Sequence, residues 1–230
     1  GEFGAVGGPN GSGKSTRRRA FSRVLRPRLG NALLDGRDLY GLSSAETARS
    51  VAVVPQQSVT DFAFTCREVV TMGRSPHLKP FRGESEEDHS VVRRAMERTG
   101  TWELRDRILP ELPGGERQRV LVARAFAQAP RVLLLDEATA HLDLLYQVRI
   151  LRMIDDLRNE KKTSIVASFH DLNLAARHAD RVIILSNGRV AAAGTPEEVI
   201  VESTLREIFG DVLCVRPHPV SDRPMVLLDS

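Results

Sequence analysis

The chain has 230 residues, 41% of them hydrophobic and 27% charged, and its formal net charge at pH 7 is +3. These values indicate a globular protein with a sizeable core and one or two domains. No segment approaches the roughly 20 consecutive apolar residues of a membrane-spanning helix, and residues 1–3 lack the features of a signal peptide. A role at a membrane would therefore require a partner protein.

The cysteines and arginines narrow the class of protein further. Cys66 and Cys214 lie far apart and have no metal-ligand spacing, so we expect reduced, buried thiols in a cytosolic protein. Arginines crowd the segment 17–28 and could contact phosphates, but a solvated helix face is the simpler interpretation. These arginines are Arg17, Arg18, Arg19, Arg23, Arg26 and Arg28. Since no recognisable nucleic-acid module accompanies them, no nucleic-acid partner is expected.

The first predicted strand covers residues 3–6, and the glycine-rich segment behind it opens onto a predicted helix. The apolar stripe expected on this helix contains Ala20, Phe21, Val24 and Leu25. Strand, glycine loop and helix follow one another in the order that a phosphate-binding site requires.

The next part of the chain is predicted to be mainly helical. A short buried strand over residues 51–54 precedes it. Residues 65–68 and 85–88 each have the spacing of a capping box, which marks the start of a helix. No strand pattern interrupts residues 65–109, so this segment is expected to form a separate helical lobe.

Two short, continuously apolar runs, residues 132–135 and 164–167, are typical of parallel strands covered on both faces. A helix is predicted between them. Its expected inner stripe is Leu144, Val148, Leu151 and Ile154.

A hairpin is predicted after these strands, because residues 182–185 and 190–193 flank the turn dipeptide Asn187-Gly188. Residues 195–198 then supply an N-cap threonine and a first-turn proline for a short helix.

The glycine loop, residues 8–16, satisfies the pattern G-x-x-x-x-G-K-[ST]. Its glycines let successive backbone N–H groups point at phosphates, Lys14 can reach the β- and γ-phosphates, and the Ser15 hydroxyl can bind Mg²⁺. The predicted nucleotide-binding residues are Gly8, Pro9, Asn10, Gly11, Ser12, Gly13, Lys14, Ser15 and Thr16.

Two carboxylates, Asp136 and Glu137, follow the buried run 132–135. An ionised pair at a strand end is unfavourable unless a cation or a reacting water uses it. Asp136 fits a Mg²⁺ ligand and Glu137 a general base that polarises the attacking water. Together with the glycine loop, the pair indicates an ATPase.

A second glycine-lined helix start, the signature segment, covers residues 112–118 and could also contact phosphate. One nucleotide rarely needs two such ends, so the second is expected to serve a nucleotide held by another copy of the chain. Two copies would then enclose two ATP molecules. The predicted residues for this contact are Leu112, Pro113, Gly114, Gly115 and Glu116.

Taken together, these segments resemble the ATP-binding cassette proteins, and the resemblance spans essentially the whole chain. It implies an α/β fold of the P-loop NTPase class, with a RecA-like mixed sheet. The core would comprise residues 1–64 and 110–230, and the helical subdomain residues 65–109.

The resemblance also implies roles for further residues. Gln56 would contact Mg²⁺ and sense a transmembrane partner, Asp143 would couple the two sites of the dimer, and His170 would contact the γ-phosphate. Mg²⁺ would be held by Ser15, Gln56 and Asp136, with ATP as the nucleotide.

Residues 69–77 and 170–177 are similar to those of importer ATPases for iron-siderophore, haem or cobalamin. This likeness implies two transmembrane permease subunits, indirectly a substrate-binding protein, and a peripheral position on the cytoplasmic face of the membrane. The cargo itself is not encoded in this subunit.

The chain departs from the family pattern at several positions. Pro113 replaces a serine whose hydroxyl binds the opposite nucleotide, so turnover is expected to be impaired. Arg17 and Arg18 replace leucines on the inner stripe and must either reach solvent or find a partner. Gly4 and Gly7 stand where β-branched residues are usual, which predicts a less stable N-terminal region.

The chain also begins almost at the glycine loop, so the antiparallel strands and adenine-stacking aromatic residue of relatives are expected to be truncated. A nucleotide-binding but hydrolysis-impaired cassette is therefore the alternative function. The ATPase head of a chromosome or repair protein is a third possibility. It would require a long coiled coil before the signature segment, and no sustained heptads occur there.

Overall fold

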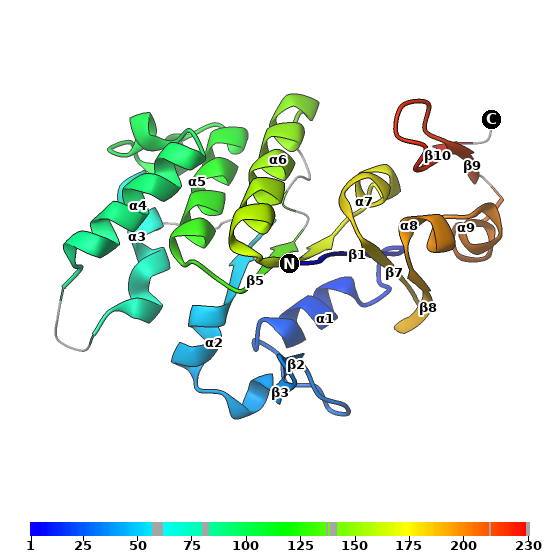
Figure 1. Cartoon of the computed structure of the whole chain (residues 1–230), viewed down its shortest axis with the longest axis horizontal. Helices are drawn as coiled ribbons and strands as arrows, with labels where there is room; N and C mark the ends of the chain where they lie inside the picture. Colours follow the sequence, from blue (N-terminus) through cyan, green and yellow to red (C-terminus); the bar gives the residue numbers. More distant parts are fainter. Residues whose placement is uncertain (57–61, 80–82, 137, 139–141, 212, 229–230) are drawn as a thin grey trace.

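A computed structural model describes residues 1–230 with the exception of 57–61, 80–82, 137, 139–141, 212 and 229–230. A six-stranded sheet crosses the molecule in the order β4-β5-β6-β1-β7-β8 (Figure 1). Neighbouring strands are parallel from β4 through β7, and β8 alone pairs antiparallel, with β7. The strands are β1 (Phe3–Gly7), β4 (Val51–Val54), β5 (Val132–Asp136), β6 (Ser164–Ser168), β7 (Arg181–Ser186) and β8 (Arg189–Gly194). This parallel-rich mixed sheet confirms the predicted fold class.

Helices cover both faces of the sheet. α1 (Lys14–Phe21) lies on one face, while α6 (Leu144–Lys161) and α7 (Leu172–His178) lie on the other (Figure 1). α2 (Ser44–Ser50) packs beside β4. Since both faces are covered, many apolar side chains of the central strands are inaccessible to water. Fully buried strand side chains include Phe3, Leu133, Leu134, Ile165 and Ile184.

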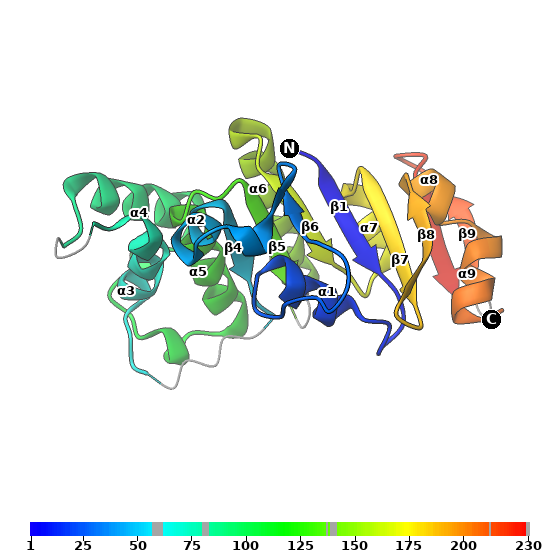
Figure 2. The same ribbon diagram turned by 90° about the horizontal axis from the view of Figure 1, so that it is seen from below.

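A helical group lies at one end of the molecule (Figure 2). It contains α3 (Cys66–Thr71), the 3-10 helix η2 (Met72–His77), α4 (Glu86–Arg98) and α5 (Gly114–Ala127). Both predicted capping boxes are formed, at Thr65 before α3 and at Ser85 before α4. α5 packs on α3 and α4 and also contacts β4. It therefore joins the helical group to the sheet, and the division of the core from residues 65–109 stays a prediction.

The two cysteines are free thiols in different surroundings. Cys66 is buried, and this burial raises the pKa of its thiol, whereas Cys214 is half-buried. Within the described residues, no helix combines the length and the apolar character of a membrane span.

The C-terminal part begins with the predicted hairpin. Asn187 and Gly188 both have positive φ, 49° and 76°, as a tight two-residue hairpin turn requires. α8 (Pro196–Val199) starts at the predicted Thr195 capping box. α9 (Glu202–Phe209) and an antiparallel pair, β9 (Leu213–Pro217) and β10 (Pro224–Leu228), complete the chain.

Shorter elements lie between α1 and α2. They are β2 (Leu33–Leu34), β3 (Arg37–Asp38) and the 3-10 helix η1 (Leu39–Gly41). Two more 3-10 turns, η3 (Trp102–Leu104) and η4 (Leu109–Glu111), precede α5.

Two predicted inner stripes are wrong in part. α1 ends at Phe21, and the side chains of Val24 and Leu25 are 74% and 44% exposed. Positions 14, 17, 18 and 21, which repeat every third or fourth residue, line a cavity between α1 and the sheet instead. On α6, Leu144 is 74% exposed. The buried side chains of α6 are Ile150, Leu151, Ile154 and Leu157, which belong to the main hydrophobic core.

Candidate functional site

The glycine loop connects β1 to α1 through a backbone that side chains would obstruct. Gly8, Gly11 and Gly13 have φ values of 137°, 79° and 100°, in the region that favours glycine. A Cβ on Gly8 would collide with the backbone carbonyl oxygen of Leu185 in β7. This close approach to the sheet holds the loop in place at the end of β1.

Two polar side chains of the loop, those of Ser12 and Lys14, are buried. Lys14 is 8% exposed, and its Nζ donates hydrogen bonds to the carbonyl oxygens of Gly8 at 2.8 Å and Pro9 at 3.1 Å. The Ser12 side chain is buried, and its Oγ has no hydrogen-bond partner among the described residues. A buried hydroxyl without a partner is costly, so a ligand that supplies one would be favoured here.

The remaining loop residues stay accessible. Asn10, Gly11, Ser15 and Thr16 are exposed, and Pro9 and Gly13 are half-buried. The loop therefore combines an open outer side with positive-φ glycines, a buried lysine and an unpartnered hydroxyl. These features fit the phosphates of a nucleotide.

The predicted acidic residue Asp136 ends β5, beside the glycine loop helix. Its Oδ1 lies 2.9 Å from Nε of Arg18 on α1, and the two side chains are 16% and 22% exposed. The Nε–H is not aligned for a hydrogen bond, so the contact is an ion pair by distance. Ser168 Oγ lies 3.4 Å from the same carboxylate oxygen and also donates to the Leu135 carbonyl at 3.2 Å.

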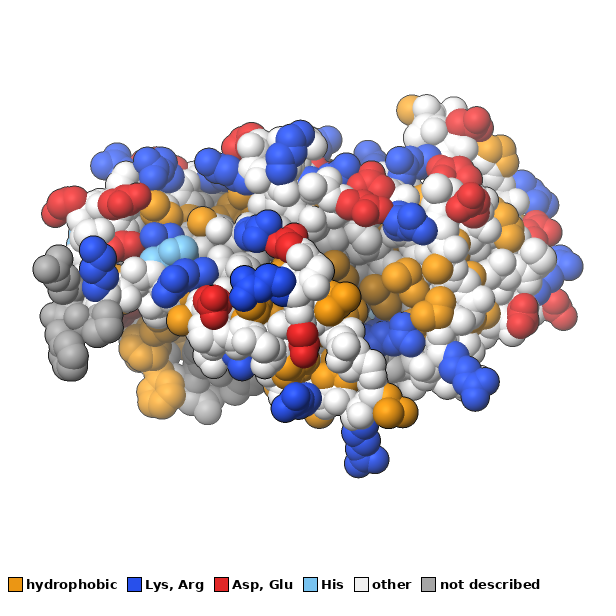
Figure 3. All heavy atoms as spheres, turned by 60° about the horizontal axis from the view of Figure 1, so that its bottom comes forward, with side chains coloured by type: hydrophobic (Ala, Val, Ile, Leu, Met, Phe, Trp, Pro, Cys, Tyr) orange, Lys and Arg blue, Asp and Glu red, His pale blue; other side chains and the backbone are white. Residues whose placement is uncertain are grey.

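These contacts give Arg18 the partner that its place on the inner stripe requires. Arg17 is directed elsewhere, with its Nη2 3.4 Å from the carbonyl oxygen of Gly188 in the hairpin turn. Arg19 on α1 is exposed, as a solvated helix face predicts, whereas Arg26 and Arg28 are exposed in the segment after the helix ends. Figure 3 looks onto this side of the molecule and shows Lys and Arg side chains interspersed with apolar ones.

Oxygen ligands for Mg²⁺ are present, but one of them, Asp136, already forms an ion pair. Ser15 is exposed, Gln56 is half-buried just after β4, and Asp136 is paired with Arg18. Oxygen donors of this kind suit a hard divalent cation. The set therefore fits Mg²⁺ chemically once Arg18 leaves the carboxylate.

Parallel strands bring several predicted residues to one edge of the sheet. The glycine loop follows β1, Gln56 follows β4, Asp136 ends β5 and His170 follows β6, and these four strands all run the same way. His170 is exposed beyond the end of β6. Glu137 and residues 139–141 lie outside the described residues. The common edge is the usual position of ligand sites in open α/β sheets.

The signature segment is built separately, where α5 and α6 begin. Leu112 is buried, Pro113 is the N-cap of α5 without a side-chain hydrogen bond, and Gly114 is exposed. Asp143 caps α6 by accepting a hydrogen bond from the Tyr146 N–H at 2.9 Å. Figures 1 and 2 place α5 in the helical group, apart from the glycine loop.

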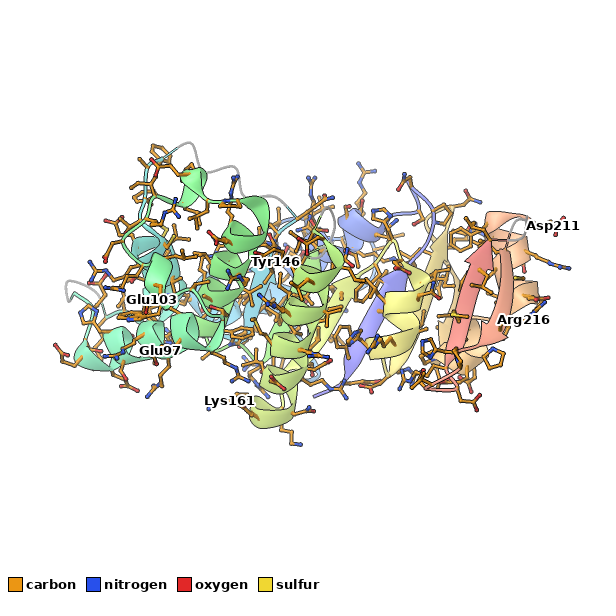
Figure 4. The ribbon with its side chains drawn as sticks, turned by 90° about the horizontal axis from the view of Figure 1, so that it is seen from above. Glu97, Glu103, Tyr146, Lys161, Asp211 and Arg216 are labelled. Atoms are coloured by element: carbon orange, nitrogen blue, oxygen red, sulfur yellow. The ribbon has the colours of Figure 1, made fainter. Side chains whose placement is uncertain are left out.

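Tyr146 joins the two helix starts, and the sequence patterns did not identify it. It lies on the side of α6 that faces α5 (Figure 4), and a Cβ on Gly115 would stand 3.0 Å from its ring. The guanidinium of Arg119 lies over the same ring, 5.7 Å from its centroid. Gly115 is thus required for close packing against an aromatic ring. Only the packing of α5 on α6, which no local pattern encodes, reveals this contact.

Comparison with known proteins gives consistent matches. Residues 1–140 match the family model described as ABC transporter. The chain is 46% identical over 216 residues to the cobalamin import ATP-binding protein BtuD of Halobacterium salinarum, covering 94% of this chain and 54% of that protein. It is 37% identical over 227 residues to the ferric enterobactin transport ATP-binding protein FepC of Escherichia coli, covering 99% and 84%.

Solved structures show the same fold. An inward-facing metal-chelate type ABC transporter superimposes with a TM-score of 0.86 at 26% identity, covering 100% of this chain and 88% of that one. The dimeric, ADP- and Pi-bound ATP-binding cassette MJ0796 gives 0.73 at 27% identity, covering 84% and 85%. The chain spans about half the length of the cobalamin relative.

Proposed function

Because the chain belongs to the ABC transporter family, we propose that it is the ATP-hydrolysing subunit of an importer for iron-siderophore, haem or cobalamin. The observation that carries the proposal is the glycine loop, which holds the buried Lys14 and the unpartnered Ser12 hydroxyl at the same edge of the sheet as Asp136. The cargo class follows the names of the relatives, a cobalamin import ATP-binding protein and a ferric enterobactin transport ATP-binding protein.

Residues 8–16 would bind the phosphates of ATP. Lys14 would turn from the carbonyls of Gly8 and Pro9 towards the β- and γ-phosphates, and the N–H groups of the loop would donate to the phosphate oxygens. Mg²⁺, with Ser15, Gln56 and Asp136 as its proposed ligands, would neutralise charge on those oxygens.

Three further side chains have proposed roles around the phosphates. Glu137 would accept a proton from the attacking water and so act as the general base. His170, which follows β6 at the same sheet edge, would contact the γ-phosphate. Gln56 would respond to the membrane partner, because it stands between β4 and the helical group.

A dimer would complete each site. Residues 112–116 at the start of α5 are apart from this chain's own glycine loop, so they would contact the nucleotide of a second copy. Asp143, which caps the adjoining helix α6, would couple the two sites. Support comes from the similarity to a cassette whose structure is dimeric.

Two permease subunits are the proposed membrane partners, on whose cytoplasmic face the dimer would sit, with a substrate-binding protein on the far side. The helical group offers a surface for them. Phe62 and Met72 are 69% and 41% exposed, and Met72 borders a hollow of about 400 Å³. Exposed apolar side chains beside a hollow are typical of protein-binding surfaces.

The proposal is tested by measuring ATP hydrolysis of the purified protein beside a Glu137→Gln variant. Loss of a general base lowers rates by about 100-fold or more, so the variant should be nearly inactive. It should still bind a fluorescent ATP analogue as tightly as the parent. Hydrolysis that survives unchanged in the variant would contradict the role of Glu137, and absence of nucleotide binding in both proteins would contradict the proposed function.

A further inference from the structure

The ion pair between Arg18 and Asp136 joins two parts of the nucleotide site. Nε of Arg18 lies 2.9 Å from Oδ1 of Asp136, and both side chains are largely buried. Arg18 stands one helical turn after Lys14 on the same side of α1. The helix that begins at the glycine loop therefore presents a permanent positive charge to the carboxylate at the end of β5.

The other cations of α1 have different partners. Lys14 donates to the carbonyl oxygens of Gly8 and Pro9, and Arg17 approaches the carbonyl oxygen of Gly188. Of these three side chains, Arg18 forms the ion pair with Asp136. Ser168 adds a hydroxyl near the same carboxylate oxygen, at 3.4 Å.

Arg18 has poor alternatives to this position. The space beside it is a cavity of about 60 Å³ between α1 and the sheet. Most of its other lining residues are apolar, among them Val6, Leu134, Val166 and Ile183. A guanidinium that moved into this cavity would lose its counter-ion and its hydration together, which is strongly unfavourable. The structure therefore holds Arg18 against Asp136.

We propose that Arg18 competes with the divalent cation for Asp136 and thereby lowers the affinity of the nucleotide complex for Mg²⁺. A cation bound to this carboxylate would lie within a few ångströms of the guanidinium, and the two positive charges would repel each other. Arg18 thus sets how tightly the nucleotide site binds Mg²⁺. The inference rests on the proposed function, because it concerns the same ATP and Mg²⁺.

The test is a Mg²⁺ titration of nucleotide binding, with a fluorescent ATP analogue as the probe. The parent, Arg18→Leu and Arg17→Leu are compared, starting from EDTA-treated protein. Arg17→Leu is the matched control, since it removes the same charge one position away on the same helix without touching Asp136.

Arg18→Leu should lower the half-saturating Mg²⁺ concentration about tenfold, which corresponds to about 1.4 kcal/mol, the size of one charge-assisted contact. Arg17→Leu should leave it within about twofold of the parent, since long-range charge effects are screened by salt. If Arg18→Leu does not fold, Arg18→Gln removes the same charge with a polar side chain and gives the same comparison.

The outcomes separate the two proposals. Nucleotide binding with the same Mg²⁺ dependence in all three proteins would contradict the proposed competition between Arg18 and Mg²⁺. It would still agree with the proposed ATP-binding function. Equal shifts in both leucine variants would also contradict the competition, because a general charge effect would then be sufficient. No nucleotide binding by any of the proteins would overturn the proposed function itself, and the competition with it.

Discussion

Arg17 shows how one residue can lower stability. It lines the cavity under α1 together with apolar side chains, and its hydrogen bond to the Gly188 carbonyl is long, at 3.4 Å. The side chain of Arg17 therefore lines an apolar cavity, while its guanidinium gains little from a long contact at an exposed carbonyl. Arg18 occupies a similar position, but Asp136 compensates for its charge.

We predict that Arg17→Leu raises the free energy of unfolding by about 1–2 kcal/mol, because leucine would fill apolar space that arginine leaves. Arg18→Leu should gain less, since it leaves Asp136 without its counter-ion. The measurement is urea denaturation, with Arg19→Leu, at an exposed position, as the control. A parent that is as stable as Arg17→Leu would contradict this account of the cavity.

For single residues, features encoded by neighbours in the sequence were predictable, whereas contacts with distant residues were not. The glycine loop follows from a motif whose parts are adjacent in sequence. That Arg18 needs a partner follows from its place on the helix. The identity of that partner depends on how α1 lies over β5, which only the folded chain defines. The contact of Tyr146 with Gly115 depends in the same way on the packing of α5 against α6.

Among the elements, α4 is fixed at its start by a buried network. Asp88 accepts hydrogen bonds from the Ser85 hydroxyl at 2.6 Å, the Ser85 N–H at 3.0 Å and Arg74 Nε at 2.9 Å. Arg74 also donates to the Ala127 carbonyl at the end of α5, at 2.8 Å. The Ser85 hydroxyl and N–H, followed by Arg74, hold the pKa of Asp88 well below its usual range.

We predict that Asp88→Asn lowers the free energy of unfolding at pH 7 by about 2–3 kcal/mol, because charged hydrogen bonds are lost. A depressed pKa stabilises the folded state above the pKa of the unfolded chain, about 4, and this contribution fades as the pH falls below it. The difference between the proteins should therefore shrink from pH 7 towards pH 2–3 in urea titrations.

Asp211→Asn is the matched control for Asp88→Asn, because the Asp211 side chain is 92% exposed and lies at the far end of the molecule (Figure 4). Its stability should equal that of the parent at every pH. A difference for Asp88→Asn that stays constant down to pH 2–3 would show that the ionised carboxylate is not what stabilises the start of α4.

The ends of helices and strands were predictable wherever the capping or turn residues are close together in the sequence. The capping boxes at Thr65, Ser85 and Thr195 and the Asn187-Gly188 turn all form as expected. Inner faces were less predictable, because a helix buries whichever side meets its neighbours. α1 therefore places arginines against the sheet, and α6 buries side chains that begin at Ile150 rather than at Leu144.

For the whole molecule, the start of α5 is the feature that a second copy would use. Pro113 caps this helix without a side-chain hydrogen bond, and Gly114 beside it is exposed. A serine at an N-cap stabilises a helix start by about 1 kcal/mol and adds a hydroxyl that can contact phosphate. Proline provides neither effect.

We predict that Pro113→Ser raises the ATPase rate severalfold and, in a Glu137→Gln background, promotes ATP-dependent dimers detected by light scattering. Pro110→Ser is the control, because Pro110 is also exposed and lies just before the signature segment. Equal ATPase rates for the parent and Pro113→Ser would refute the importance of this hydroxyl for turnover.

The position of β1 in the sheet has a consequence for how the protein is made. β1 pairs on its two sides with β6 and β7, which begin at Ser164 and Arg181. At about 5–20 residues per second, a ribosome needs roughly 10–30 s to extend the chain from β1 to β6. Until then the strand that carries the glycine loop has no sheet partner. Nucleotide binding would thus be among the last properties that the nascent chain acquires, and a truncated translation product would lack it.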